Sequence, residues 1–399
     1  MAASVRVCLA RPGRRGPAGR IPAVRHFLLS FAVSAGTTLW LVHSAKHLQA
    51  PRDADFSKPQ KIHTHEVLRI GGLGIVLGLL AAAAWLPWTM GAEAAALAWA
   101  LLACSIPAFA AGFYQDWRDD LTPRWRLVAT ALSAVLSFCL LDVAIRETAI
   151  PGLDWVASFT AGSLFLTVLA VTGIANAINI IDGLNGLASM CVMIMLAAVA
   201  YVAFNVGDTL VATLALAGVG AVLGFFIWNF PTGLIFLGDG GAYFLGFYLA
   251  EVAILLLVRN PGVSPLFPLV VCLYPIVETL FSIYRRFWLR SSLPSLPDGI
   301  HLHSLLYRRL MRWAVGNRTA KAMNRRNSMT STYLWLLCST SVVPAVLFWD
   351  ASGPLMVALM LFVVGYVVLY WRIVRFKSPR WLRLARPARP VVKGDNSLT

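Results

Sequence analysis

The chain has 399 residues, of which 58% are hydrophobic and only 13% are charged. With a mean hydropathy of +0.71, this composition excludes a soluble globular protein and predicts an all-α integral membrane protein. The formal net charge of +16 at pH 7 is therefore interpreted first as a signal of membrane topology.

Apolar stretches long enough for a helix to cross a bilayer, roughly 20 residues, recur along the chain. We predict about eleven transmembrane helices, at residues 27–43, 70–90, 94–112, 127–144, 161–178, 184–204, 210–228, 242–258, 265–284, 333–349 and 355–370. They form one polytopic domain, residues 27–376, between a basic N-terminal tail, residues 1–26, and a basic C-terminal tail, residues 377–399.

The distribution of Lys and Arg orients these helices, because both residues favour cytoplasmic loops. Loops after odd-numbered spans, with the C-terminal tail, hold 26 of the 34 basic residues, whereas loops after even-numbered spans hold only Arg146 and Arg259. We therefore expect the odd-numbered loops and the C-terminal tail to be cytoplasmic. The six arginines before Phe27 contradict this orientation. Either the other loops outweigh them, or residues 1–26 are not part of the mature protein.

The loop after the first predicted span carries basic side chains beside two glycines. Lys61, His63 and Arg69 could contact an anionic ligand, and Gly71 and Gly72 would let the next helix N-terminus approach it closely. The competing interpretation is that these basic residues only set the topology, and for each residue alone it is at least as strong.

Three carboxylates fall within five positions after the third predicted span, at Asp116, Asp119 and Asp120. Asp116 is the closest of them to the bilayer, where a carboxylate is costly, so it is the functional candidate. Asp119 and Asp120 fit loop or N-cap positions.

The central polar motif has Asn176, Asn179, Asp182 and Asn185 at every third residue between two apolar runs. An ionised Asp is costly in hydrocarbon, so we expect the motif to line a polar cavity or a binding site. We predict that one helix ends near Asp182 with Gly183 as its C-terminal cap, and that the next begins with Asn185 as its N-cap. The alternative is a polar hairpin whose Asn side chains only satisfy helix ends.

Another polar motif follows two spans later, with Asn229 near its start and Asp239 between glycines at the start of the eighth predicted span. Backbone N–H groups and the helix dipole would lie beside Asp239, so phosphate and a hard cation could both be held there. The alternative is a glycine-rich turn that only begins a helix.

The basic loop after the ninth predicted span contains His301 and His303. Leucines from Leu302 onwards follow helical spacing, which is typical of an amphipathic helix on an anionic membrane surface. A zinc site formed by these two histidines with His63 and His65 is a weaker alternative, because no further ligand pattern accompanies them.

These polar loops share one side of the membrane. The loops with Lys61, Asp116, Asp182, Asp239 and His301 follow spans one, three, five, seven and nine, so an even number of crossings separates any two. Carboxylates, glycine-flanked helix ends and basic side chains on one face are the groups needed to handle magnesium-bound phosphate beside a lipid.

With these motifs in this order, the chain resembles the polyprenyl-phosphate N-acetylhexosamine-1-phosphate transferases of glycosyltransferase family 4. That family includes phospho-N-acetylmuramoyl-pentapeptide transferase and undecaprenyl-phosphate N-acetylglucosaminyl-1-phosphate transferase. The motifs that carry the resemblance lie at residues 61–63, 69–72, 176–188, 229, 236–239 and 298–303. The chain looks more like the initiators of O-antigen and teichoic acid synthesis than like the pentapeptide transferase, which has its own histidine-rich loop.

The resemblance implies that undecaprenyl phosphate attacks the β-phosphorus of a UDP-N-acetylhexosamine and that UMP is released. It implies magnesium as cofactor, with manganese as an alternative, UDP-GlcNAc or a related donor, and a role in starting an O-antigen-like surface polysaccharide. The protein would be a multi-pass protein of the bacterial inner membrane with its active site on the cytoplasmic face. The lipid bilayer is its surroundings, no nucleic acid is expected as a partner, and a homodimer is left open.

The resemblance also implies roles for individual residues. The catalytic candidates are Asp116, Asp182, Asp239, His301 and His303, with Asp239 and Asp182 as metal ligands and Asp116 near the attacking phosphate. The candidate substrate-binding residues are Lys61, His63, Arg69, Asn176, Asn179, Asn185 and Asn229. The second pKa of a phosphate monoester is about 6, so charge neutralisation and alignment should matter more than proton removal.

Four positions depart from the pattern of the family. Gln115 and Asn185 stand where many relatives have Asp, Ser304 where they have a third His, and Ala242 where they have Ser. Two alternatives therefore stay open: a catalytically inactive scaffold, and a transporter or lipid flippase with a similar number of spans. Polar clusters at span ends on one side favour chemistry on a lipid head group over transport.

Overall fold

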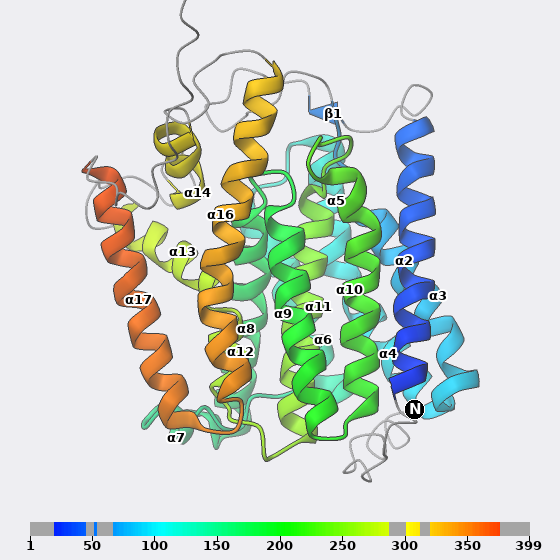
Figure 1. Cartoon of the computed structure of the whole chain (residues 1–399). Helices are drawn as coiled ribbons and strands as arrows, with labels where there is room; N and C mark the ends of the chain where they lie inside the picture. Colours follow the sequence, from blue (N-terminus) through cyan, green and yellow to red (C-terminus); the bar gives the residue numbers. More distant parts are fainter. Residues whose placement is uncertain (1–19, 45–51, 54–66, 287–300, 312–319, 376–399) are drawn as a thin grey trace, which may run out of the picture.

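The computed structural model describes residues 20–44, 52–53, 67–286, 301–311 and 320–375 as a bundle of helices (Figure 1). Its elements in chain order are α2 (Arg20–His43), β1 (Arg52–Asp53), β2 (Val67–Leu68), α3 (Gly72–Met90), α4 (Ala92–Cys104), α5 (Ile106–Arg118), α6 (Pro123–Leu141), α7 (Leu153–Ala157), α8 (Thr160–Ile181), α9 (Leu187–Asn205), α10 (Thr209–Asn229), α11 (Gly238–Arg259), α12 (Phe267–Val271), α13 (Leu273–Tyr284), α14 (Leu302–Leu305), η4 (Leu306–Met311), α16 (Ala320–Leu347) and α17 (Ser352–Val374). The two short strands pair in antiparallel fashion.

Ten helical segments in the described part of the chain are long and apolar enough to cross a membrane, which confirms the predicted all-α polytopic fold. The predicted span at residues 265–284 differs, because it consists of two short helices, α12 and α13, of 5 and 12 residues. Pro275 lies in the first turn of α13 and has no N–H to donate to the carbonyl oxygen four residues earlier, which disfavours one continuous helix there.

The predicted polar loops meet at one end of the bundle. Asp239 at the start of α11 contacts Asn179 near the end of α8 and Arg69 just before α3. A Cβ atom on Gly183, two residues after α8, would lie 2.9 Å from Nε2 of His303. Figure 1 shows α14 and β1 at the same end. The arrangement on one side is therefore as predicted, and its assignment to the cytoplasmic face stays a prediction.

Helix α11 is the most enclosed of the ten candidate membrane-spanning helices in the described part of the chain. Inside the protein, 89% of its most apolar stretch is buried, compared with 17% for α17. It packs against α3, α5, α8 and α9, and the rings of Tyr243, Phe244 and Phe247 on it are at most 2% exposed. The N-terminus of α11, where Asp239 lies, is therefore held from several sides.

Helix α2 lies in a groove between α3 and α10 that small residues make narrow. A Cβ atom added to Gly224 of α10 would lie 2.6 Å from the carbonyl oxygen of Phe31. The hydroxyl of Ser34 donates a hydrogen bond of 2.6 Å to the carbonyl oxygen of Ala221 across the same contact. Close backbone approach through small residues is typical of membrane helices. Helix α2, which begins at Arg20 and thus before the predicted start of the first span, is an integral part of the bundle.

We expect Gly224→Leu to reduce the amount of folded protein strongly, because even its Cβ atom would meet Phe31 at 2.6 Å and the Cβ of Ser34 at 2.8 Å. The control is Gly365→Leu on α17, where an added Cβ atom meets nothing within 4 Å. Monodisperse yield in detergent and the melting temperature measure the effect. Wild-type values for Gly224→Leu would contradict the close packing of α2.

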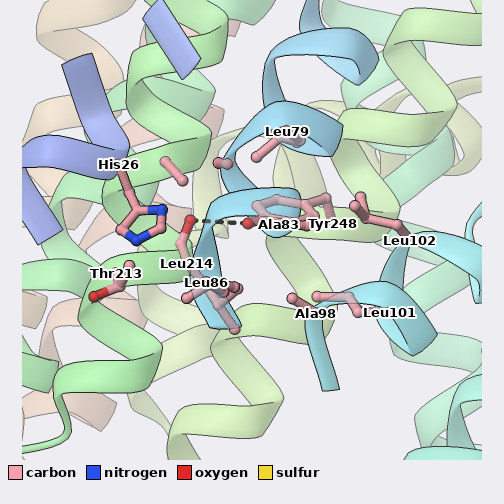
Figure 2. A pocket seen from close by; sticks show the side chains of 12 residues that line it. His26, Leu79, Ala83, Leu86, Ala98, Leu101, Leu102, Thr213, Leu214 and Tyr248 are labelled. Atoms are coloured by element: carbon pink, nitrogen blue, oxygen red, sulfur yellow. Dashed lines mark hydrogen bonds between the residues drawn. The ribbon is translucent and has the colours of Figure 1, made fainter. Parts of the chain in front are cut away.

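A small cavity lies between α2, α3, α4, α10 and α11 (Figure 2). Leu and Ala side chains form most of its lining, and the cavity volume of about 10 Å³ leaves room for roughly one water. Nε2 of His26 is 2.8 Å from Oγ1 of Thr89, and the Tyr248 hydroxyl donates to the carbonyl oxygen of Leu214 (2.8 Å). None of the predicted site residues that the structure describes lines this cavity.

Candidate functional site

Two neighbouring segments fix the N-terminus of α11. Backbone groups of residues 68–72 form three hydrogen bonds with residues 236–237, with donor–acceptor distances from 2.8 to 3.0 Å. A Cβ atom on Gly112 would lie 2.6 Å from the Cα atom of Gly240, so α5 reaches α11 only because both positions lack a side chain. Asp239, which precedes Gly240, is thereby held between α3 and α5.

Asp239 is the point at which polar groups from different helices converge. Its Oδ1 accepts a hydrogen bond of 3.0 Å from Nδ2 of Asn179 and lies 3.7 Å from Nη2 of Arg69. Its Oδ2 accepts a hydrogen bond from Nη1 of Arg126. The structure thus brings together Arg69, Asn179 and Asp239, which lie on three separate loops in the sequence.

Arg126 is a residue of this site that the sequence analysis missed. It lies in the first turn of α6, its side chain is 14% exposed, and its guanidinium lies 5.8 Å from the ring centre of Tyr243. Its Nε is buried and makes no hydrogen bond with the described residues. Its place in the same predicted loop as Asp116 could have indicated this role, but Arg126 was used only as one of the basic residues that orient the spans.

Asp116 caps the start of α11. Its Oδ1 accepts from the backbone N–H of Asp239 and its Oδ2 from that of Gly240, both at 2.9 Å. Nε of Arg69 lies 3.6 Å from Oδ1, and Asp116 is 5% exposed. A carboxylate at a helix N-terminus satisfies free N–H groups and interacts favourably with the helix dipole. The structure therefore shows a positioning contact for Asp116, and its contact with an attacking phosphate stays a prediction.

The chain turns between α8 and α9 in the central motif. Asp182 is the C-cap of α8, and Gly186 is the N-cap of α9 with a φ of +70°. The prediction that Asn185 would be the N-cap is wrong, because this cap has a left-handed backbone conformation that favours glycine. Gly183 likewise follows the C-cap instead of forming it.

Asp182 belongs electrostatically to the Asp239 cluster. Desolvation of its carboxyl raises the pKa of Asp182 to about 7, Asp239 and Asp116 contribute in the same direction, and Arg69 opposes the shift. Carboxylates that lie close enough to repel one another favour a bound cation, which would remove this repulsion.

Asn185 and Asn229 lie in a neighbouring cluster and hold backbone groups. Oδ1 of Asn229 accepts from the N–H of Gly186 (2.6 Å), and its Nδ2 donates to the carbonyl oxygen of Ile235 (2.8 Å). Nδ2 of Asn185 donates to the carbonyl oxygen of Pro231 at 3.1 Å. Substrate contact for these two residues stays a prediction, while their structural contacts are clear.

The N-terminal half of α16 also supports the central motif. The backbone N–H of Asn185 donates to Oδ1 of Asn327 (2.9 Å), and its carbonyl oxygen accepts from the hydroxyl of Ser331 (2.7 Å). Asn324 accepts from the Asn185 amide at 3.3 Å. The predicted span begins at residue 333, whereas α16 begins at Ala320, so these turns lie outside the prediction. The signal was the spacing of Asn324, Asn327 and Ser331, which places them on one helix face.

Three further residues were predicted to belong to the site, and the structure describes one of them, Asn176. Oδ1 of Asn176 accepts a hydrogen bond of 3.4 Å from the hydroxyl of Tyr243, whose ring lies beside Arg126. Lys61 and His63, predicted to contact phosphate groups, lie outside the described residues. Their part in the site stays a prediction.

The histidine loop lies against the central motif. His301 precedes α14, and Nε2 of His303 lies beside Gly183. The leucines of this segment were expected to face a membrane surface. Instead, Leu302, Leu305 and Leu306 are at most 5% exposed and belong to the protein core. Their burial orders the loop and brings His303 to the site.

The residues of the cluster fit a magnesium ion that is shared with a substrate. Among the described residues, no three His, Cys, Asp or Glu side chains are grouped to hold a metal ion by themselves. Mg²⁺ is commonly bound by one or two carboxylates together with substrate phosphates. Asp239 and Asp182 supply two carboxylates that repel one another and offer oxygen atoms as ligands, which fits such a site.

Comparison with known proteins gives consistent matches. The model of glycosyl transferase family 4 matches residues 98–257, which include Asp116, Asp182 and Asp239. A probable undecaprenyl-phosphate N-acetylglucosaminyl 1-phosphate transferase of Bacillus subtilis is 27% identical over 210 residues, 52% of this chain and 53% of that protein.

Two more relatives match shorter or similar stretches. An undecaprenyl-phosphate alpha-N-acetylglucosaminyl 1-phosphate transferase of Thermotoga maritima is 31% identical over 93 residues, 23% of this chain and 30% of that protein. A phospho-N-acetylmuramoyl-pentapeptide-transferase of Geobacillus thermodenitrificans is 34% identical over 197 residues, 47% of this chain and 60% of that protein. The matches thus span less than two thirds of each of these relatives. Over residues 98–257 the chain is therefore similar to glycosyl transferase family 4.

Proposed function

We propose that the protein transfers N-acetylhexosamine 1-phosphate from a UDP-sugar to undecaprenyl phosphate. The observation that carries this proposal is the convergence of Asp116, Asp182 and Asp239 with Arg69 and Arg126 at one end of a membrane bundle. Such a cluster combines groups for a cation with groups for phosphate, and it lies at one end of helices long and apolar enough to cross a membrane. The names of the relatives support the same activity.

The proposed reaction is a displacement at phosphorus. An oxygen of undecaprenyl phosphate forms a bond to the β-phosphorus of the UDP-sugar, and the bond from that phosphorus to the bridging oxygen breaks. The electron pair of the broken bond leaves with UMP, so the products are a lipid-linked sugar diphosphate and UMP. The attacking phosphate is largely a dianion at neutral pH, because its second pKa is about 6, and therefore needs no strong base.

In this mechanism the side chains mainly position groups and neutralise charge. Asp239 and Asp182 would hold magnesium, or manganese in its place, and the ion would supply charge neutralisation at the donor diphosphate. Arg69 and Arg126 would exchange their contacts with Asp239 for contacts with phosphate oxygens, which a guanidinium binds well. His301 and His303 would contact phosphate from the side of Gly183, and Asp116 would keep α11 in place.

The donor and the pathway are further parts of the proposal. UDP-GlcNAc or a related UDP-N-acetyl sugar is the proposed donor, because two relatives are named for N-acetylglucosaminyl transfer. The product would start an O-antigen-like surface polysaccharide. The protein would act in the bacterial inner membrane, with its polar end on the cytoplasmic side, as the Lys and Arg distribution favours.

The test is UMP release by the purified full-length protein with undecaprenyl phosphate, magnesium and a panel of UDP-N-acetylhexosamines. We expect release that requires both the lipid and the metal, and that stops when a chelator is added. Sugar-nucleotide hydrolysis in the absence of lipid would contradict the proposed acceptor. No release with any donor from well-folded protein would contradict the proposed function.

A further inference from the structure

A buried carboxylate lies behind the two histidines of the site. Glu278 of α13 has no solvent-exposed side-chain surface, and its Oε1 accepts a hydrogen bond of 2.7 Å from the backbone N–H of Leu302. The same oxygen lies 3.6 Å from Nδ1 of His303 and 3.8 Å from Nδ1 of His301. Its other oxygen, Oε2, accepts a hydrogen bond of 2.8 Å from the hydroxyl of Tyr366 on α17.

The histidine rings share one orientation relative to this carboxylate. The rings of His301 and His303 are parallel within 5°, with centres 5.3 Å apart, and both direct Nδ1 towards Glu278. The opposite nitrogen of His303, Nε2, lies beside Gly183, next to Asp182. The carboxylate is thus on the far side of the ring from the polar cluster.

We propose that Glu278 is a positioning residue that keeps the two histidines protonated at Nδ1 and directs Nε2 of His303 towards the substrate phosphates. This inference rests on the proposed transferase function. A carboxylate near one ring nitrogen favours a proton there, and so determines what the other nitrogen presents to a ligand. Glu278 acts through the histidines and does not itself contact substrate.

The geometry distinguishes this role from simple support of the fold. The contacts with Leu302 and Tyr366 would suffice to satisfy a neutral amide at this position, since its oxygen could accept from Leu302 and its NH₂ could donate to the Tyr366 oxygen. A negative charge at Glu278 would attract two protonated Nδ1 atoms that face the same oxygen more strongly than a neutral amide oxygen would. A buried carboxylate is costly unless it is paired, so the charge has a reason to be there.

Glu278→Gln tests the inference, because it keeps the shape and both hydrogen bonds but removes the charge. We expect kcat for UMP release to fall about 10- to 100-fold, the range for groups that orient a functional histidine, with a smaller change in KM and an unchanged melting temperature. Tyr366→Phe, which leaves the charge, should have a smaller effect. Glu147→Gln, at an exposed position, is the matched control and should behave as wild type.

A double-mutant cycle shows whether Glu278 acts through the histidines. In a background with both His301→Gln and His303→Gln, Glu278→Gln should change kcat by no more than about twofold. The same 10- to 100-fold loss in that background would overturn the inference, because the effect would then bypass the histidines. Wild-type activity of the single Glu278→Gln variant would also overturn it.

An NMR measurement that does not depend on transferase activity tests this inference separately from the proposed function. In ¹⁵N-histidine-labelled protein, the His301 and His303 signals, assigned from the His301→Gln and His303→Gln variants, should show a protonated Nδ1. Glu278→Gln should shift these signals while leaving the other histidines unchanged. If the wild type releases no UMP, the proposed function fails and this spectrum alone decides the role of Glu278. Signals that do not respond to Glu278→Gln would overturn that role.

Discussion

We expect Asp239→Asn to lower transferase activity by at least about 1,000-fold while the protein stays folded. Losing a metal-binding carboxylate removes several kcal/mol of charge stabilisation, and each 1.36 kcal/mol corresponds to about a tenfold change in rate. Asn keeps the size of the side chain and one acceptor oxygen, so it can keep the hydrogen bond from Asn179 or the one from Arg126, but not both. Because the Asp239 side chain is 15% exposed, water can satisfy the group that loses its partner. UMP release, together with the melting temperature in detergent, measures both effects.

The control for this variant is Asp142→Asn. Asp142 is also next to a helix end and pairs with Arg146 at 2.5 Å, but its side chain is 46% exposed and it lies outside the polar cluster. It should retain wild-type activity. Activity of Asp239→Asn within about tenfold of wild type would contradict the assigned metal role, since one oxyanion-stabilising group alone contributes about 100- to 1,000-fold.

Hydropathy located the spans, and the number of spans between two loops showed which loops share one side of the membrane. Both can be read from local composition, so they predicted the fold well. An apolar run of sufficient length can satisfy its backbone in a membrane only as a helix, so ten spans could be located without tertiary information. The break at Cys272 between α12 and α13 was missed because both halves are apolar. The first turns of α16 were missed for the opposite reason, since their polar side chains resemble a loop until a partner such as Asn185 is known.

The even number of crossings between the polar loops also predicted that these loops lie on one side. It did not predict which atoms contact one another. It placed Arg69, Asp116 and Asp239 on one side, and the structure brings them into contact. It could not assign a partner to Arg126, which lies 113 positions before Asp239 in the sequence. Nor could it show that Asn185 faces α16, because the handedness of a five-residue turn depends on the conformation of Gly186.

In the structure, the negative and positive charges of the polar cluster face one another. The carboxylates of Asp116 and Asp239 face the guanidiniums of Arg69 and Arg126 at close range. A cation at Asp239 would compete with Arg126, whereas a phosphate would compete with Asp239 for the same guanidinium. Binding the metal and the diphosphate together satisfies both sides at once, which predicts that each binds more tightly in the presence of the other.

We expect Asp116→Asn to lower both activity and stability, in contrast to Asp239→Asn. Both oxygens of Asp116 accept buried backbone N–H groups, and an amide can accept only one of them while its NH₂ would face the other. Leaving a buried donor unpaired costs about 1 to 3 kcal/mol, so the melting temperature should fall measurably.

Activity should fall with stability because Asp239 begins the same helix, and a shift of α11 would move the proposed metal ligand. The reaction is sensitive to such displacement, since a misplacement of about 1 Å can cost roughly 100-fold. Asp120→Asn, in the exposed loop that follows α5, is the control and should change neither property. If Asp116→Asn lost activity at an unchanged melting temperature, Asp116 would act on the substrate directly, and its contact with the start of α11 would be secondary.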